Sequence, residues 1–352
     1  MGSKILGLDP GTAFLQVAEQ DKGKIKFKSI RNVFVELSSF ENDDIEQILK
    51  QNNWEYVKDD KYYYVTGEDS LKIARLFPDI EIRRPMQNGV LNKEEDKKML
   101  IMASMIENAI GKAQDKNSVV CYCVSSPVID IVSDNVFHKN RIEGILKRLG
   151  FIPKCVNEGM GILFSERPVV INEEGEEIPY SGIAISWGAG RTNAILAYRG
   201  LQIIGMSCNR GGDYIDKKVA EQTNSPISQV IHAKETKLDF SNIDYDDDLQ
   251  FAMDVYYSNL IEYVLKNFAK KFASVKSEFE APLPMVIAGG TSMPNGFCDK
   301  VKNVVNKLEL PFKISEIIHA KNPLTSVVQG LLTQAIISQK RLQEKEIDEM
   351  LD

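Results

Sequence analysis

The residues of this sequence best suited to chemistry lie in four glycine-rich turns, each of which follows a predicted strand. They are Asp9-Pro-Gly-Thr12, Trp187-Gly-Ala-Gly-Arg-Thr192, Asn209-Arg-Gly-Gly-Asp213 and Ala288-Gly-Gly-Thr-Ser292. A phosphate needs backbone N–H groups that converge on its oxygens, and glycine allows a close approach because it has no Cβ. Any one of them could be a plain tight turn. Together they indicate a site for a phosphorylated ligand.

Two carboxylates lie next to such segments. Asp9, at a strand end beside its turn, suits a hydrated magnesium ion, which keeps most of its waters and needs only one or two carboxylates; a solvated turn aspartate is the alternative. Glu158 precedes a helix-like run. It could orient a water for attack on a γ-phosphate, or it could be a helix-start carboxylate that interacts with the helix dipole.

Several other chemistries are excluded. The sequence has no GxxxxGK[ST] phosphate loop and no GxGxxG fingerprint. His138, His232 and His319 lie in no HExxH or nucleophile-elbow setting, so we expect surface or capping histidines. The five cysteines are scattered, and Cys121 and Cys123 fall on one face of a predicted strand. We therefore expect packed thiols, with no zinc site and no disulfide framework.

Composition describes a globular chain. The 352 residues are 43% hydrophobic and 26% charged, which favours two domains. The 43 Lys and Arg against 50 Asp and Glu give a formal charge of −7, so no basic field exists to bind nucleic acid. No stretch is long and apolar enough to span a membrane, and Asp9 comes too early for a signal-peptide core. We expect a cytoplasmic protein.

An internal repeat would position two of the four turns. The first copy runs from Lys4 to a third strand that begins at Ile25, and the second runs from Gly182 to a third strand that begins at Leu201. In each copy a buried-looking strand ends in a small polar residue, turns through glycines and returns as a second strand. Two such halves facing each other would enclose a cleft with a glycine-rich hairpin on either side.

Other segments alternate between helical and strand patterns. We expect helices over 95–112, 135–149 and 227–238, buried strands over 118–124 and 284–288, and a helical pattern from Leu324 to Leu351. Residues 31–82, with a helix-like stretch at 44–50, and residues 209–278 interrupt the repeat, and both are expected to be accessory subdomains.

Five segments of the chain resemble the motifs of the superfamily of actin, sugar-kinase and heat-shock-chaperone ATPases, and they occur along the chain in the order that the family has. Leu8–Thr12 and Ser186–Thr192 are similar to its two phosphate motifs, and Val286–Pro294 to its adenosine motif. Asn157–Gly161 and Asn322–Gly330 are similar to its two connecting segments. Arg84–Asp96 and Pro323–Val327 further resemble prokaryotic actin homologues of the MreB kind. A sugar kinase would need a catalytic aspartate at the cleft, which the sequence does not reveal.

The resemblance implies an α/β actin-like ATPase fold with two lobes, each with a duplicated RNase-H-like core and an accessory subdomain. The first lobe would comprise 1–156 and 331–352, with its core at 1–30 and 83–156, the accessory subdomain at 31–82 and a C-terminal helix at 331–352. The second would comprise 157–330, with its core at 157–208 and 279–330 and the accessory subdomain at 209–278.

The same resemblance assigns roles to individual residues around ATP or ADP and Mg²⁺. Asp9 would hold the magnesium ion through water, and Glu158 would position the attacking water. The remaining nucleotide contacts would be Gly11 and Thr12 at the β-phosphate; Ser186, Gly188, Gly190, Arg191 and Thr192 around the γ-phosphate; Gly211, Gly212 and Asp213 near the ribose; Gly289, Gly290 and Thr291 around the adenosine; and Lys234 and Glu235 beside the purine.

One departure concerns the second phosphate motif. It normally begins with an aspartate that helps to hold the metal shell, and this sequence has Ser186 there, while Arg191 and Asn193 also differ from the usual residues. Each 1.4 kcal/mol, roughly, of lost transition-state stabilisation lowers the rate tenfold. A weak ATPase is therefore expected. Arg191 could supply positive charge to the γ-phosphate or lie on the surface.

We therefore expect an ATP-binding protein that polymerises into cytoskeletal filaments, with nucleotide bound between two lobes and slow hydrolysis regulating assembly. Its partners would be further copies of itself and an adaptor or cargo protein, with no membrane contact through the N-terminus. The alternatives are a chaperone-like or scaffold ATPase that does not polymerise, and a nucleotide binder without turnover.

Overall fold

The chain divides into two compact units in the computed structural model, which describes residues 3–21, 23–38, 45–77, 79–131, 135–275 and 281–351, without the side chains of 345–351. The first unit comprises Met1–Tyr122, Asp134–Cys155 and Gln334–Asp352. The second comprises Cys123–Ser133 and Val156–Thr333. Three of the four boundaries fall within regular elements, namely strands β9 (Val119–Val124) and β10 (Ile152–Asn157) and helix α10 (Ser326–Leu351), and the fourth lies outside the described residues.

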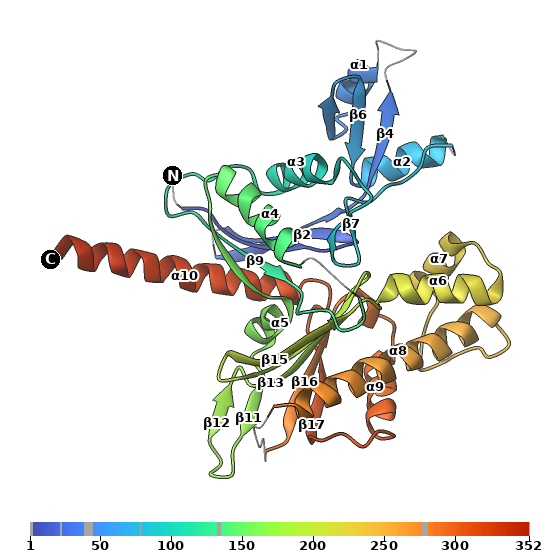
Figure 1. Cartoon of the computed structure of the whole chain (residues 1–352), viewed down its shortest axis with the longest axis vertical. Coiled ribbons are helices and arrows are strands. Elements are labelled where there is room, and N and C mark those ends of the chain that lie inside the picture. The colour runs from blue at the N-terminus through green and yellow to red at the C-terminus, as the bar shows by residue number, and fades with distance from the viewer. Residues whose placement is uncertain are drawn as a thin grey trace. The chain divides into compact units, whose positions relative to one another are not determined.

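A five-stranded sheet in the order β10-β9-β1-β2-β3 is the centre of the first unit (Figure 1). Its strands are β1 (Ile5–Pro10), β2 (Phe14–Asp21), β3 (Lys24–Arg31), β9 (Val119–Val124) and β10 (Ile152–Asn157). The first three form an antiparallel meander, and β9 runs parallel to β1. Leu6 and Leu8 are fully buried. The uninterrupted apolar run of β9 fits a strand that is buried on both faces.

Two helices of the first unit follow the apolar periodicity of the sequence. Helix α3 (Lys98–Ile110) buries a stripe that includes Met102, Ile106 and Ile110, and α4 (Asn135–Arg148) buries Ile142 and Leu146. Both helices begin and end within a few residues of the predicted bounds. Glu95, where the predicted pattern started, lies before α3 and makes an ion pair described below.

The segment between β3 and α3 has its own three-stranded antiparallel sheet, β4-β6-β5. Its elements are β4 (Phe34–Ser38), α1 (Ile45–Gln51), β5 (Tyr56–Asp59), β6 (Tyr62–Thr66) and α2 (Glu68–Leu76), followed by the short strands β7 (Met86–Gln87) and β8 (Val90–Leu91). Val35, Leu49, Val65 and Ile73 form a separate small core there. The predicted stretch 44–50 is helical from Ile45, and Asp44 lies outside the described residues.

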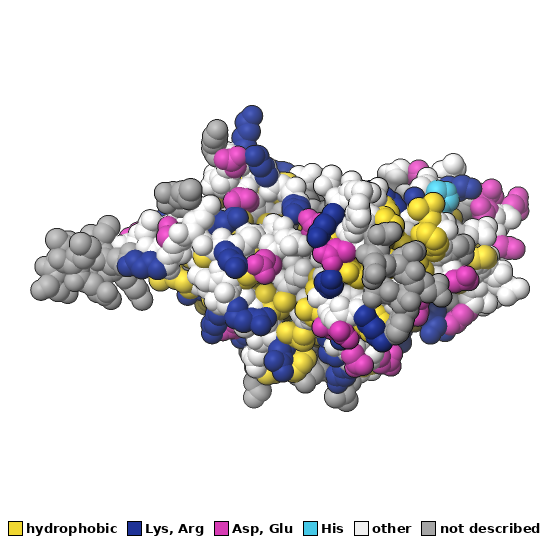
Figure 2. Space-filling model, turned by 90° about the horizontal axis from the view of Figure 1, so that it is seen from above, with side chains coloured by type: hydrophobic (Ala, Val, Ile, Leu, Met, Phe, Trp, Pro, Cys, Tyr) yellow, Lys and Arg dark blue, Asp and Glu magenta, His cyan; other side chains and the backbone are white. Residues whose placement is uncertain are grey.

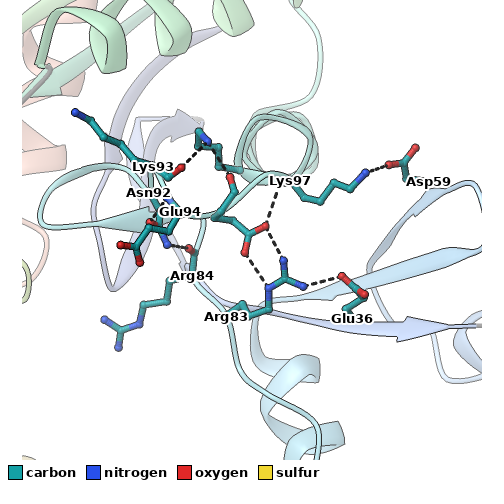
Figure 3. A network of polar contacts seen from close by, with 10 residues as sticks. Glu36, Asp59, Arg83, Arg84, Asn92, Lys93, Glu94 and Lys97 are labelled. Carbon is teal, nitrogen blue, oxygen red and sulfur yellow. Dashed lines mark hydrogen bonds and ion pairs between the residues drawn. The ribbon is translucent and has the colours of Figure 1, made fainter.

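Arg83 fastens this sheet to the segment that leads into α3. Its guanidinium donates to both carboxylate oxygens of Glu95, at 2.9 and 2.8 Å, and to Glu36 of β4 at 2.6 Å. The guanidinium also lies over the ring of Phe34, 5.0 Å from its centroid. Figure 3 shows this network together with the Lys97–Asp59 pair, which joins the residue before α3 to β5. A bidentate pair fixes orientation as well as distance.

The second unit repeats the strand order of the first. Its five-stranded sheet has the order β15-β14-β13-β16-β17, with an antiparallel meander β13-β14-β15 and parallel neighbours β13, β16 and β17. The strands are β13 (Gly182–Trp187), β14 (Thr192–Tyr198), β15 (Leu201–Cys208), β16 (Leu283–Ala288) and β17 (Ile314–His319). The repeat predicted from the sequence is therefore present in three dimensions.

Helices and a small hairpin complete the second unit. They are α5 (Glu158–Glu166), β11 (Val169–Ile171), β12 (Glu177–Pro179), α6 (Gly212–Thr223), α7 (Ile227–Thr236), α8 (Asp248–Ala273), the 3₁₀ turn η1 (Gly290–Ser292), α9 (Phe297–Val305) and the start of α10 (Ser326–Leu351). Helix α8 buries Tyr257, Ile261, Val264 and Phe268 in the main core of this unit.

Helices α5 and α10 touch backbone to backbone within the second unit. A Cβ built on Gly330 would lie 1.8 Å from the carbonyl oxygen of Gly161, and one built on Gly161 would lie 2.7 Å from that of Val327. No side chain fits between the helices at this point. Ser326 adds a hydrogen bond to Glu166 at 3.2 Å.

One expectation about the minor chemistry is wrong and one is confirmed. His138 was expected at the surface or at a helix cap, but it is 3% exposed inside α4, because the apolar stripe of that helix includes its position. Cys121 and Cys123 are buried, as expected for packed thiols, and none of the five cysteines, all of which are described, forms a disulfide. Within the described ranges, no helix has the length and apolarity that crossing a membrane requires.

The α5–α10 contact gives a stability prediction. Gly330→Ala should lower the free energy of unfolding by about 3 kcal/mol or more, because the methyl group has no room beside the Gly161 carbonyl. Chemical denaturation monitored by circular dichroism would measure the change. Gly144→Ala is the matched control: Gly144 lies in α4 with nothing within 4 Å of the added methyl group. That exchange should stabilise the protein by up to about 1 kcal/mol. Equal effects of the two exchanges would contradict the prediction.

Candidate nucleotide site

Three glycine turns of the second unit meet at one backbone atom, the carbonyl oxygen of Gly188. It accepts hydrogen bonds from the amide of Gly212 at 3.0 Å and from the hydroxyl of Thr291 at 2.9 Å. The amide of Gly188 donates to the carbonyl of Arg191 at 3.0 Å, which closes the hairpin between β13 and β14. The structure thus brings together the turns at 187–192, 209–213 and 288–292, which are far apart in the sequence.

Parallel pairing of β13 and β16 explains why two of these turns are neighbours. Ser186 is in register with Ala288, so both strands reach the same edge of the sheet at the same level. The carboxyl edge of parallel strands is the usual position of a ligand site in open α/β sheets. Trp187, fully buried at the end of β13, packs edge-on against Phe297 with ring centroids 5.4 Å apart, which fixes the start of the turn.

Glycine is required at these turns for steric reasons. A Cβ on Gly211 would lie 2.4 Å from the carbonyl oxygens of both Gly188 and Ala189. One on Gly289, whose φ is +98°, would lie 2.4 Å from the carbonyl of Trp187. Any larger residue would push the turns apart, because such distances are shorter than van der Waals contact. The glycines therefore create the convergence at Gly188.

The hairpins of both repeats contain amide groups that could receive an anion. None of the described residues accepts a hydrogen bond from the amides of Ala189 and Gly190, or from those of Gly11 and Thr12 in the equivalent turn of the first unit. Backbone N–H groups held in such turns form concave anion sites. These four amides fit phosphate oxygens.

The turn at 209–213 has a different role for its backbone. The amides of Gly212 and Asp213, at the start of α6, donate to the carbonyls of Gly188 and Ala189 at 3.0 and 2.9 Å. These two groups hold the hairpin and are already hydrogen-bonded. The turn is itself held by the carboxylate of Asp130, which accepts from the amide of Asn209 at 2.8 Å and from Tyr263 at 3.2 Å.

The first-unit turn is held by residues that sequence reasoning missed. The side-chain amide of Asn32, which is fully buried, donates to the carbonyl of Gly11 at 2.8 Å. The hydroxyl of Thr12 accepts from the amide of Gly89 at 2.9 Å, and its own proton remains available for donation. Asp9 is half-buried at the end of β1. Among the described residues, no group of three His, Cys, Asp or Glu side chains is placed to hold a metal directly.

Glu158 is the first residue of α5 and lies beside Ser186. Asn157 caps the helix, since its side chain accepts from the amide of Gly159 at 3.0 Å. The Glu158 carboxylate accepts from Ser125 at 3.0 Å and also from Ser186. Burial raises the pKa of Glu158, and the two serines and the charge of Arg191 act in the opposite direction. The position at a helix start and a role toward a bound water are both compatible with this geometry.

Arg191 does not lie on the surface, which removes one of the two predicted alternatives. Arg191 is 4% exposed, and its guanidinium interacts electrostatically with Glu158 and Asp130. Burial lowers the pKa of Arg191 to about 10, against the effect of these carboxylates, so the side chain stays charged at neutral pH. The hairpin that follows Ser186 thus contains a buried cation.

Asn193 connects three segments of the site. Its side-chain oxygen accepts from the amide of Ser126 at 2.7 Å, and its side-chain nitrogen donates to Asn157 at 3.0 Å. Asn157 in turn donates to the hydroxyl of Ser126 at 2.7 Å. Ser126 had no role in the sequence analysis. The only signal for it was its position, together with Ser125, directly after the predicted strand 118–124.

Lys234 is half-buried in α7, and Glu235, the next residue, is exposed. The ammonium group of Lys234 makes an ion pair with Asp216 of α6 at 2.7 Å, and both side chains are largely buried. It would lie 3.2 Å from a Cβ on Gly212. Burial raises the pKa of Asp216, and the adjacent Lys234 opposes that effect.

The turn at 288–292 is braced from two sides. The amide of Gly289 donates to the carbonyl of Pro323 at 2.9 Å, and the hydroxyl of Ser292 donates to the carbonyl of Gly289 at 2.7 Å. Ser292 also contacts Nε2 of His319 at 3.2 Å, and burial lowers the pKa of that histidine. A neutral imidazole therefore supports this turn at neutral pH.

Solved structures share this architecture. The "MamK double helical filament" matches with a TM-score of 0.67 at 17% identity, over 94% of this chain and 98% of that one. MreB 5 of Spiroplasma citri bound to AMPPNP matches with a TM-score of 0.68 at 12% identity, over 98% and 99%. Its ADP-bound form gives 0.65 at 12%, over 97% and 98%. The predicted actin-like fold is confirmed.

The family follows from the sequence match. Residues 5–335 match the Volactin family, and because this range is most of the chain, the protein belongs to that family. A search of curated proteins gives no significant match.

The Asn193 network gives a prediction for the integrity of the site. Asn193→Leu should lower the free energy of unfolding by about 2–3 kcal/mol, because the buried amide of Ser126 and the side chain of Asn157 lose their partner. Thermal and chemical denaturation would measure the loss. Asn172→Leu, at a half-buried residue between β11 and β12 that donates to Glu176, is the control and should change stability less. An Asn193→Leu variant as stable as the unmodified protein would contradict the assigned role.

Proposed function

We propose that this protein binds ATP with Mg²⁺ and assembles into cytoskeletal filaments whose stability depends on slow hydrolysis. The observation that carries the nucleotide part is the convergence of three turns on Gly188, with available amides in both repeat hairpins. The filament part is supported by the fold, which is shared over nearly the whole chain with a protein described as a double helical filament. The AMPPNP and ADP complexes of MreB 5 support the choice of ligand.

The proposal assigns each turn a part of the nucleotide. Gly11 and Thr12 serve the β-phosphate, and Ser186, Gly188, Gly190 and Thr192 surround the γ-phosphate. Gly211, Gly212 and Asp213 line the ribose; Gly289, Gly290 and Thr291 serve the adenosine; and Lys234 and Glu235 flank the purine. Since the amides of Gly212 and Asp213 are already bonded within the protein, we assign this turn to shape more than to donation.

The proposed metal site uses Asp9, which would hold Mg²⁺ through water. The ion would supply charge neutralisation to the phosphates. A carboxylate at the end of β1, beside the available amides of Gly11 and Thr12, suits a hydrated ion that needs few protein ligands. Thr12 can donate its hydroxyl proton to a phosphate oxygen while it accepts from Gly89.

Glu158 is the proposed group that orients the water for hydrolysis. Ser125 and Ser186 hold its carboxylate in one orientation, and Arg191 favours the ionised form, which accepts a hydrogen bond from water. Arg191 is buried and charged, so it also contributes positive potential to the γ-phosphate side of the site. Because Ser186 supplies no charge to a metal shell, we propose weak turnover.

The proposed partners are copies of the protein itself, together with an adaptor or cargo protein, in the cytoplasm. In such a system ATP favours one conformation only through its higher affinity for that conformation. A chaperone-like or scaffold ATPase that switches partner binding would use the same site. It differs in one measurable property, because it would not assemble with ATP.

The catalytic assignment can be tested with Glu158→Gln. We expect phosphate release to fall by about 10²-fold or more, because a neutral amide orients water poorly and accepts no proton. Nucleotide affinity should change little, as measured with a fluorescent ATP analogue. Glu221→Gln, at an exposed glutamate of α6, is the control and should leave the rate unchanged. Full activity of the Glu158→Gln variant would remove this role from Glu158.

The filament assignment can be tested by ultracentrifugal pelleting and negative-stain electron microscopy. Protein at tens of micromolar should pellet with Mg-ATP, and it should pellet less with EDTA or without nucleotide. A protein that binds ATP and stays monomeric would refute filament assembly and favour the scaffold alternative. Failure to bind ATP would refute the nucleotide site itself.

A further inference from the structure

Strand β3 is an open edge of the first-unit sheet. It pairs with β2 on one side, and no other strand in the described part of the chain pairs with it on the other. Six successive residues, 24–29, are exposed. Its apolar side chains Ile25 and Phe27 are 43% and 42% exposed. An edge strand presents unpaired backbone groups to a partner, and exposed apolar side chains add to that tendency.

The same strand is strongly basic. Lys24, Lys26 and Lys28 alternate with the apolar pair, and β3 contains no acidic residue. Lys26 pairs with Asp21 at 2.6 Å, and Lys28 donates to the carbonyl of Asn108 at 3.0 Å, so these side chains have defined positions. We call the exposed set Lys24, Ile25, Lys26, Phe27 and Lys28 the basic edge.

The internal repeat provides a built-in comparison for this strand. Strand β15 occupies the equivalent edge of the second unit and also exposes an apolar pair, Leu201 at 70% and Ile203 at 40%. Its sequence, Leu-Gln-Ile-Ile-Gly-Met-Ser-Cys, contains no charge. The fold therefore does not require lysines at this edge, and the charge of β3 needs a separate explanation.

A complementary surface lies at the start of α8 in the second unit. Four of the five residues from Asp244 to Asp248 are aspartates. Tyr245 and Phe251 are 65% and 49% exposed and pack edge-on, with ring centroids 6.1 Å apart. Figure 2 shows acidic side chains over the end of the second unit formed by α6, α7 and the start of α8. We call Asp244, Tyr245, Asp246, Asp248 and Phe251 the acidic tip.

Only part of the acidic tip is explained by the helix. Asp247 caps α8, because its carboxylate accepts from the amides of Leu249 and Gln250 at 2.9 and 3.3 Å. Asp248 lies in the first turn, where a negative charge interacts favourably with the helix dipole. Asp244 and Asp246 lie before the helix, and both are exposed. Helix capping and the interaction with the helix dipole do not account for the exposed rings of Tyr245 and Phe251.

We propose that the basic edge of one copy docks on the acidic tip of the next copy, and that this contact joins subunits of the filament. The inference rests on the proposed filament function and names its partner surface. A chain with a net charge of −7 repels its own copies, so a contact between them needs a local region of positive charge. The lysines lie on one face of β3 and Ile25 and Phe27 on the other, so the open edge between the faces offers cations to the carboxylates of the tip on one side and apolar groups to its aromatic rings on the other.

This arrangement predicts an open polymer. The two surfaces differ, so each copy can use both, one toward each neighbour, and such head-to-tail contacts produce filaments unless a ring closes. The unpaired N–H groups of an edge strand can donate to the tip carboxylates. Opposite charges speed association and select the partner, while the buried aromatic groups contribute most of the affinity.

Charge reversal on each surface tests the contact. An edge variant combines Lys24→Glu with Lys28→Glu and leaves the Lys26–Asp21 pair intact. A tip variant combines Asp244→Lys with Asp246→Lys and leaves the cap residue Asp247 intact. Each alone should raise the critical concentration for pelleting with Mg-ATP at least about tenfold, because like charges then face each other. Lys302→Glu with Lys307→Glu, at exposed positions of and beside α9, is the charge-matched control and should assemble normally.

Mixing the two variants gives the decisive result. In an equimolar mixture, the reversed edge of one variant meets the reversed tip of the other, and the two unmodified surfaces also meet. Pelleting should return to near the level of the unmodified protein, as alternating copolymers. A merely structural role for these residues would give no recovery. Circular dichroism and melting temperature would verify that each variant is folded.

The outcomes separate this inference from the proposed function. If the unmodified protein does not pellet with Mg-ATP, both are wrong. If it pellets and the variants assemble as well as it does, or if folded variants do not recover on mixing, the filament function stands and this contact is wrong. Variants that assemble as well as the unmodified protein would mean that the lysines of β3 only protect an exposed edge from aggregation. Phe27→Ser and Tyr245→Ser, which leave the charges unchanged, should also raise the critical concentration.

Discussion

The carbonyl oxygen of Gly188 is the atom on which the candidate site depends. This oxygen accepts one hydrogen bond from the start of α6 and one from the turn after β16. The amide of Gly188 closes the hairpin between β13 and β14. One backbone atom can hold these segments only if their backbones approach closely, which leaves no room for a Cβ at the neighbouring glycines. Thr291 reaches the oxygen with its side-chain hydroxyl. The glycines at 188, 211, 212 and 289 follow from that requirement. The amides of Ala189 and Gly190 stay available because the carbonyl groups of the hairpin make the structural bonds.

Sequence reasoning predicted the parts of the structure that have a periodic or repeated signal. The duplicated strand–turn–strand pattern predicted two similar halves, and the structure shows two sheets with the same strand order. Parallel pairing of β13 and β16 places Ser186 level with Ala288. The apolar stripes of α3 and α4 were visible for the same reason. The four glycine-rich turns could be recognised in the sequence because a close backbone approach restricts which residues can occupy such positions.

The sequence could not reveal contacts that depend on tertiary packing of single polar residues. Nothing in the chain marks Asn32 as the residue that holds the Gly11 carbonyl, or Asp216 as the partner of Lys234. Both interactions join segments whose proximity is known only after folding. His138 and Arg191 are exceptions to the general rule that polar residues are exposed. Arg191 is buried beside carboxylates, whereas His138 is buried because its helix turns that position inward.

The buried cation next to Glu158 has a consequence for how this site can change over time. Ser186 and Arg191 both act on the same carboxylate, one by a hydrogen bond and one by its charge. An acid introduced at position 186 would therefore stand beside Glu158 and in the field of the guanidinium. Its effect would depend on whether the arginine was already present. Because both residues act on one carboxylate, we expect the effects of exchanges at positions 186 and 191 to be non-additive.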